Sequence, residues 1–157
     1  VRMTERHLGA DPPTHEQVVQ ATADIDAAIR RAGEVVPLAE AHSIIGLAGS
    51  VTTVAAIHLG LPHYDPVAIH GHVVPTDHVR AISDDLLAMS HAQRAAIGVM
   101  HPGRVDVIGA GALVLRRILD LTGLDEVVVL PINERYTAEH TAFVADVIRT
   151  AAAELAR

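Results

Sequence analysis

The feature that most constrains this chain is an alternation of short apolar runs with longer stretches of helical periodicity. The apolar runs cover residues 42–48, 105–108 and 126–130, and glycines follow the first two directly. Continuous apolar runs of this length are typical of strands in a sheet that helices cover on both faces. The alternation therefore predicts an α/β fold with a partly parallel sheet flanked by helices, in a single domain over residues 1–157.

Capping residues and apolar periodicity place the expected helices. Thr14 and Gln17 have the spacing of a capping box, and the periodic stretch behind them ends at Gly33. Further helices are expected over 51–59, after a cap at Thr76, and from a cap at Ser90 to near Gly98. Another is expected from the glycines that follow residues 105–108 to about Leu121, with Gly123 at its C′ position. A final helix is expected after a cap at Thr137, and its apolar face would consist of Val144, Val147, Ile148, Ala151 and Leu155. Residues 1–10 are expected to form a short edge strand, and the proline-rich stretch 61–75 an irregular connection.

Composition excludes several classes of function. The chain has no Cys, and all twelve of its basic residues are Arg, so thiolate metal sites, Schiff bases and Walker-type phosphate loops are excluded. A net charge of −7 without a basic stripe disfavours DNA and anionic membranes as partners. No apolar run reaches the roughly 18 residues of a membrane span, and the N-terminus lacks a signal-peptide core, so we expect a cytoplasmic protein. Because the chain begins with Val1, we expect it to be either a fragment of a longer protein or the product of a non-ATG start.

The first candidate site is the glycine turn at residues 46–53, where an apolar run ends and a helix begins. Free N–H groups at a helix N-terminus suit phosphate oxygens, and the turn adds hydroxyl groups. We therefore take Gly49, Ser50 and Thr52 as candidate substrate-binding residues. The alternative is a tight turn without a ligand, capped by Ser50 or Thr52.

The second candidate site follows the apolar run 105–108, which we expect to be a strand. Gly109 and Gly111 come directly after it, and Arg104 precedes it. Ligands of open α/β sheets bind at the carboxyl ends of strands, so these three residues are also candidate substrate contacts. The alternatives are close packing of a helix at the two glycines and an ion pair between Arg104 and Asp106.

The eleven histidines are scattered, and none forms a metal-binding pattern with other ligand types. His70 and His72 would face the same side of a strand, which a metal could use, but the favoured interpretation is a surface position. His101 lies beside the second glycine turn and is a candidate for substrate contact. No combination of serine, histidine and aspartate suggests a catalytic triad, and we predict neither metal ligands nor catalytic residues in this chain.

Several segments, in the same order, resemble the Ppx/GppA family of exopolyphosphatases and guanosine pentaphosphate phosphohydrolases, most closely those of actinobacteria. They are GLAGSVTTVAAIHLGLPHYDP, AIHG, LLAMSHAQRAAIGVMHPGRVDVIGAGALVL and DEVVVL, preceded by VRMTERHL and DPPTHEQV. The resemblance covers about residues 1–130 and leaves residues 131–157 unmatched. It implies an actin-like, ribonuclease-H-type lobe, in which GLAGSVTT and VIGAGA border the cleft between two lobes and Arg104 meets an anionic substrate.

The resemblance further implies removal of terminal phosphate from polyphosphate or guanosine pentaphosphate, usually with magnesium. This chain corresponds to most of the second lobe only, because no position matches the family's two phosphate loops or its catalytic Glu. We therefore expect an isolated chain without activity, magnesium ligands that lie outside it, and a partner that is the first lobe or a second copy. The alternatives are a non-catalytic polyphosphate- or nucleotide-binding module and a chimeric or engineered scaffold without a ligand.

Overall fold

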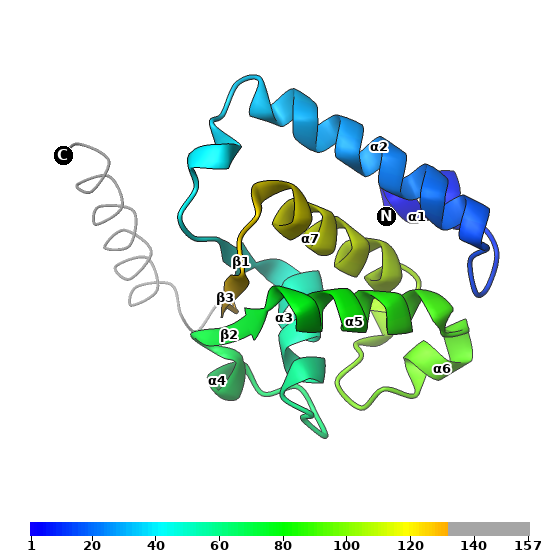
Figure 1. Cartoon of the computed structure of the whole chain (residues 1–157). Helices are drawn as coiled ribbons and strands as arrows, with labels where there is room; N and C mark the ends of the chain where they lie inside the picture. Colours follow the sequence, from blue (N-terminus) through cyan, green and yellow to red (C-terminus); the bar gives the residue numbers. More distant parts are fainter. Residues whose placement is uncertain (132–157) are drawn as a thin grey trace.

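A computed structural model describes residues 1–131 as a small mixed sheet with helices packed against it (Figure 1). The predicted helix capped by Thr137 and the unmatched tail 131–157 lie outside these residues, Pro131 apart. In chain order the elements are α1 (Arg2–His7), α2 (His15–Gly33), the 3₁₀ turn η1 (Leu38–Glu40), β1 (Ile45–Leu47), α3 (Ala48–His58), α4 (Pro66–Ile69), β2 (His72–Pro75), α5 (Thr76–Ala88), α6 (His91–Ala95), the 3₁₀ turn η2 (Pro102–Arg104), α7 (Ile108–Thr122) and β3 (Glu126–Leu130).

The sheet has the strand order β1-β3-β2. β3 runs parallel to β1, with Val128 opposite Ile45, and antiparallel to β2, with Val128 opposite Val73. The parallel pair places the first turn of α3 at the carboxyl end of the sheet. The prediction of a partly parallel sheet flanked by helices is therefore confirmed.

One face of the sheet forms the main core. The residues that point to this face are Gly46, Val74, Val127 and Val129. They are buried against α3, α5 and α7. A Cβ atom at Gly46 would lie 2.5 Å from the side chain of Val51 on α3, so glycine lets this helix lie close to the strands. Burial of these branched side chains is the main stabilising contribution at this interface.

α1 and α2 form a second layer of helices over α7 (Figure 1). Ala21 and Ile25 of α2 are buried with Leu87 and Leu113, and Met3 of α1 packs beside them. The predicted capping box of α2 is present: Thr14 Oγ1 accepts from the Gln17 N–H, and the Gln17 side chain accepts from the Thr14 N–H. The apolar face of α2 that the periodicity predicts is therefore the face that packs against α7.

Two predicted elements were wrong because tertiary contacts outweigh local pattern. Residues 2–7, expected within a short strand, form α1, whose Met3 packs against the α2 layer. The irregular connection 61–75 contains α4 and β2; Asp65 caps α4, and β2 gains its hydrogen bonds from β3.

Two local details also differ from expectation. Residues 105–107 form turns rather than a strand, and α7 already begins at Ile108. Thr76 is the first residue of α5 rather than its cap, and its Oγ1 donates to the carbonyl of Leu124 at 2.6 Å, which ties α5 to the loop before β3. Among the described residues, no helix is both long and apolar enough to span a bilayer.

Candidate functional site

The turn between β1 and α3 holds a strained residue at an open helix end. Ala48 has φ of 68°, a left-handed conformation that alanine rarely adopts, and it is exposed. No side chain caps the amide groups of the first turn of α3. These N–H groups carry partial positive charge and lack intrahelical acceptors, so the helix end favours an anion.

Two of the three hydroxyl groups in this turn are committed to the helix itself. Thr52 and Thr53 are buried, and both donate to the carbonyl of Gly49, at 3.3 and 2.7 Å. Ser50 is partly exposed beside the open end of the helix. Of the hydroxyls in the turn, Ser50 is therefore the one available to a ligand.

Arg104 reaches this helix end from η2, about fifty residues further along the chain. A Cβ atom at Gly49 would lie 2.5 Å from Arg104 Nε, so the guanidinium group lies directly over that glycine. Arg104 Nη1 donates to Thr53 Oγ1 at 3.3 Å, and the side chain is only partly exposed. The structure thus brings three predicted site residues together: Gly49, Ser50 and Arg104.

The charge of Arg104 is not neutralised within the described part of the chain. Its guanidinium forms no ion pair with any carboxylate of residues 1–131, whereas Arg80, Arg94, Arg116 and Arg117 each pair with at least one aspartate. The predicted alternative, a pair with Asp106, is not formed; Asp106 lies 3.2 Å from His91 Nε2 instead. A partly buried cation at an open helix N-terminus is an arrangement that attracts phosphate or carboxylate groups.

Arg94 positions the segment that carries Arg104, and the sequence analysis missed it. Arg94 is 8% exposed, and its Nε donates to the carbonyl of Val105 at 3.0 Å. Other guanidinium hydrogens bond the carbonyls of Leu86 and Met89 and the Asp11 carboxylate. An arginine in a short helix usually faces solvent, so nothing local marks this one as buried.

The two glycines of α7 serve packing in this structure. Gly111 lies against Ser50, because a Cβ atom there would overlap Ser50 Oγ and lie 2.7 Å from Ser50 Cβ. Gly109 is buried beside Leu87. The two residues remain candidate substrate contacts without direct support, since the crossing of α3 and α7 accounts for the absent side chain at Gly111.

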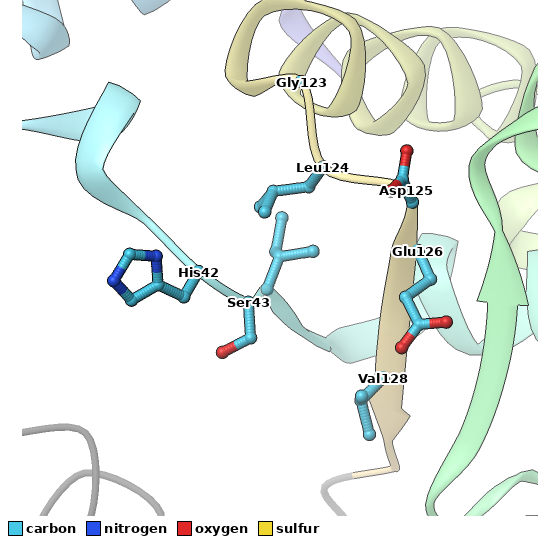
Figure 2. Close-up of a pocket in the computed structure, with 8 residues that line it drawn as sticks. His42, Ser43, Gly123, Leu124, Asp125, Glu126 and Val128 are labelled. Carbon is cyan, nitrogen blue, oxygen red and sulfur yellow. The ribbon is translucent and has the colours of Figure 1, made fainter. Parts of the chain in front are cut away.

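Cavities lie at both ends of the parallel strands. One of about 180 Å³ lies between α1, α3 and α7, and Ser50, Gly111 and Arg2 line it. A larger one of about 300 Å³ lies at the amino ends of β1 and β3, where Figure 2 shows Asp125 and Glu126 together with His42 and Ser43. The acidic lining of the larger cavity disfavours phosphate, and ligands of open α/β sheets bind at the carboxyl ends of strands.

His72, one of the two histidines of the predicted pair 70 and 72, lies against another histidine. His72 Nε2 lies 2.8 Å from His58 Nδ1, and the ring of His78 contacts His58 edge-on. Burial, together with the neighbouring His78 and His72, lowers the pKa of His58. His101, the other candidate, uses its Nδ1 to accept the Gly103 N–H in η2. Within residues 1–131, no group of three or more His, Cys, Asp or Glu residues could hold a metal ion.

The comparisons with known proteins agree with this geometry. The model of the Ppx/GppA phosphatase family matches residues 1–130. Exopolyphosphatase 2 of Mycobacterium tuberculosis is 40% identical over 133 residues, which are 82% of this chain but 42% of that protein. A bifunctional 3-dehydroquinate synthase/phosphatase of Fusobacterium nucleatum is 33% identical over 55% of this chain and 13% of its own length.

Solved structures show the same relation. An exopolyphosphatase-like protein superposes with a TM-score of 0.82 at 39% identity, over 83% of this chain and 44% of that one. A Ppx/GppA family member of Aquifex aeolicus, with a TM-score of 0.74 at 23% identity, covers 95% of this chain and 46% of its own, and shows the fold alone. The predicted actin-like, ribonuclease-H-type fold class is confirmed. The chain spans less than half the length of the curated exopolyphosphatase it matches, and it belongs to the Ppx/GppA phosphatase family.

Proposed function

We propose that this chain is part of the second lobe of an exopolyphosphatase-type phosphohydrolase, and that it binds the phosphates of polyphosphate or guanosine pentaphosphate. The observation that carries the proposal is the unpaired guanidinium of Arg104, placed over Gly49 at the open N-terminus of α3. Its charge and the amide groups of the helix converge on one exposed turn. Such donors neutralise phosphate oxygens both in the bound substrate and in the transition state of phosphoryl transfer.

We expect hydrolysis itself to require groups that residues 1–131 do not place at this turn. A phosphoanhydride is cleaved by a positioned water molecule, which needs a base within hydrogen-bond reach. The carboxylate closest to Arg104 in sequence, Asp106, has a side chain that is 74% exposed, and it faces His91. We therefore propose that the base and the other phosphate-binding groups come from the first lobe, and that the isolated chain is inactive.

The described residues do not fit a magnesium site. Magnesium prefers several oxygen ligands in near-octahedral geometry, usually one or two carboxylates together with substrate phosphates. Residues 1–131 contain no group of three or more acidic or histidine side chains that could hold a metal ion, and the α3 end presents a cation and amide donors instead. We propose that any magnesium used in the reaction is bound by residues outside this segment.

Phosphate release from long-chain polyphosphate with magnesium tests the lobe assignment. The chain is assayed alone and then mixed with a separately produced first lobe of a related exopolyphosphatase. We expect release only in the mixture, and loss of that release when Arg104→Ala replaces the native chain. Release by the chain alone would show that it contains the catalytic groups itself.

The second candidate function is a binding module that retains phosphate affinity without catalysis. It is favoured by one observation: Arg104 and the α3 helix end belong to the same chain, so both groups of the proposed anion site are present without a second lobe. Salt-dependent binding of polyphosphate without turnover, in the presence of any first lobe, would support it. Arg31→Ala on α2 removes the same charge at an exposed position and is the matched control for Arg104→Ala. Absence of polyphosphate binding would favour the remaining alternative, a scaffold without a ligand.

A further inference from the structure

The cavity of about 180 Å³ between α1, α3 and α7 opens beside the proposed anion site. Met3 of α1, together with Val107 and Val114 of the α7 segment, gives it apolar walls. Arg2 and Ser50 add one guanidinium and one hydroxyl group to the lining. An apolar cavity of roughly 150 Å³ is large enough to take up a benzene ring. The cavity therefore has room for a flat aromatic ring.

Ser50 connects this cavity to the proposed anion site. It follows Gly49, over which the guanidinium of Arg104 lies, and consecutive Cα atoms are about 3.8 Å apart. Phosphates held by Arg104 and the open end of α3 therefore lie next to the cavity. A group that is bonded to those phosphates can enter the cavity without a change in the fold.

Arg2 supplies a planar charged group to the same cavity. Within residues 1–131 its guanidinium forms no ion pair or hydrogen bond. The short helix that carries it is held in place by His7, whose Nε2 lies 3.0 Å from the Asp24 carboxylate of α2. A planar guanidinium stacks on the face of an aromatic ring. Among the described residues, no Phe, Tyr or Trp lines the cavity, so stacking there falls to Arg2.

Inorganic polyphosphate is a poor occupant of this cavity. Each of its phosphate groups is charged, and the side chains of Met3, Val107 and Val114 offer those groups no hydrogen bonds in place of water. A nucleobase suits such walls better, because it has flat faces that stack and it is joined to its phosphates through a sugar. An anion site that adjoins an apolar cavity therefore matches both parts of a nucleotide.

We infer that this cavity holds the base of a nucleoside polyphosphate, whose phosphates bind at Arg104 and the open end of α3. The inference rests on the proposed function and narrows it. Of polyphosphate and guanosine pentaphosphate, only the nucleotide uses both the anion site and the cavity. Arg2 is then the residue that determines the preference for the nucleotide, through its contact with the base.

Isothermal titration calorimetry of the full chain tests the inference with two probes that carry the same triphosphate, GTP and tripolyphosphate. Tripolyphosphate carries at least as much charge as GTP, so tighter binding of GTP reports the nucleoside. We expect the native chain to bind GTP at least about tenfold more tightly, because stacking of one base supplies a gain of this order. Binding of both probes with equal affinity would overturn the inference and leave the proposed anion site intact. Binding of neither probe would overturn the proposed function as well.

Arg2→Lys separates stacking from charge, because lysine keeps the charge and lacks the planar group. We expect this variant to lose the preference for GTP while its affinity for tripolyphosphate stays within about twofold of the native value. Arg6→Lys is the matched control on the same helix, since Arg6 does not line the cavity, and it should keep the preference. An undiminished preference in Arg2→Lys would overturn the role of Arg2.

Val107→Phe tests the cavity independently by filling it. The preference for GTP should again disappear, whereas Val67→Phe, at a position that is 72% exposed on α4, should keep it. Circular dichroism verifies the fold of each variant, and Arg2→Lys, at an exposed position, carries the test if Val107→Phe does not fold. A preference that survives in both Arg2→Lys and a folded Val107→Phe would place the base elsewhere and overturn the inference.

Discussion

The β1–α3 turn and the start of α7 look alike in sequence and differ in use. Each follows an apolar run, contains glycines and opens a helix. At the β1–α3 turn a real strand precedes the helix, Ala48 is left-handed, and the guanidinium of Arg104 occupies the space over Gly49. At the start of α7 there is no strand, and Gly111 makes room for Ser50 of the crossing helix.

The difference shows that a glycine at the start of a helix indicates that another group packs closely against the backbone there. It does not identify that group. At Gly49 the approaching group is the end of a flexible, charged side chain, which a ligand can also contact. At Gly111 it is the side chain of Ser50 from the crossing helix α3, so helix packing explains why no side chain is present there. The same substitution should therefore affect stability at one glycine and binding at the other.

The largest expected effect concerns Arg94, which holds the segment that carries Arg104. Arg94→Leu removes the donors to the carbonyls of Val105, Leu86 and Met89, which stay buried without partners. We expect a loss of roughly 3 kcal/mol in the free energy of unfolding, measured by urea denaturation. Arg6→Leu, which removes an exposed ion pair to Asp24, should cost less than about 1 kcal/mol. Equal losses would mean that Arg94 is not a structural anchor.

Gly111→Ala should reduce stability, because it disturbs the packing of two helices. Its Cβ atom would lie 2.7 Å from Ser50 Cβ, so α3 and α7 must move apart, at a cost of about 1–3 kcal/mol. Gly109→Ala is the matched control in the same helix turn, because its nearest contact is an ordinary 3.4 Å to Leu87. Urea denaturation of both variants gives the comparison, and a Gly109→Ala variant that is equally destabilised would refute the packing explanation.

Gly49→Ala should have the opposite effect, because it should weaken anion binding and leave stability nearly unchanged. Its Cβ atom displaces the flexible end of Arg104 rather than a helix, so the free energy of unfolding should change by less than about 1 kcal/mol. Polyphosphate binding should weaken by roughly tenfold, equivalent to about 1.4 kcal/mol, because the guanidinium leaves the helix end. Isothermal titration calorimetry at fixed ionic strength measures the effect. Unchanged affinity would place the anion elsewhere.

The smallest effect is expected at the far end of α3, where His58 contacts His72 and His78. Burial and these two neighbours lower the pKa of His58 in the folded state. Above the unfolded-state pKa of about 6.5 both states are neutral, so stability does not depend on this group. As the pH falls below that value, the unfolded state binds the proton more readily and stability decreases until the folded-state pKa is passed.

A His58→Gln variant isolates this contribution. The difference in unfolding free energy between native chain and variant should shrink or reverse in favour of the variant between pH 7.5 and pH 5, as approximate limits of the histidine range. A pH-independent difference would show that His58 titrates in the folded and unfolded states alike. Asp11 and Asp24 also have lowered pKa values, but as carboxylates they act at lower pH.

Local chemistry within the sequence determined the elements whose causes lie within a few residues. The capping box at Thr14, the cap at Ser90, the position of Gly123 after α7 and the apolar run that forms β3 are all as predicted. Each depends on a hydrogen bond or a period that spans less than two helical turns. The family resemblance followed from motifs of the same local kind.

Tertiary structure alone decided what the local pattern leaves open. The sequence marks Gly49, Ser50 and Arg104 as candidates, but it does not show that Arg104 lies over Gly49 without a carboxylate partner, because that depends on how η2 packs beside α3. It likewise treats the two glycine turns as equivalent and gives no sign that Arg94 is buried. Contacts between segments about fifty residues apart are set by the packing of whole elements, and only the folded chain shows which group fills the space that a glycine leaves.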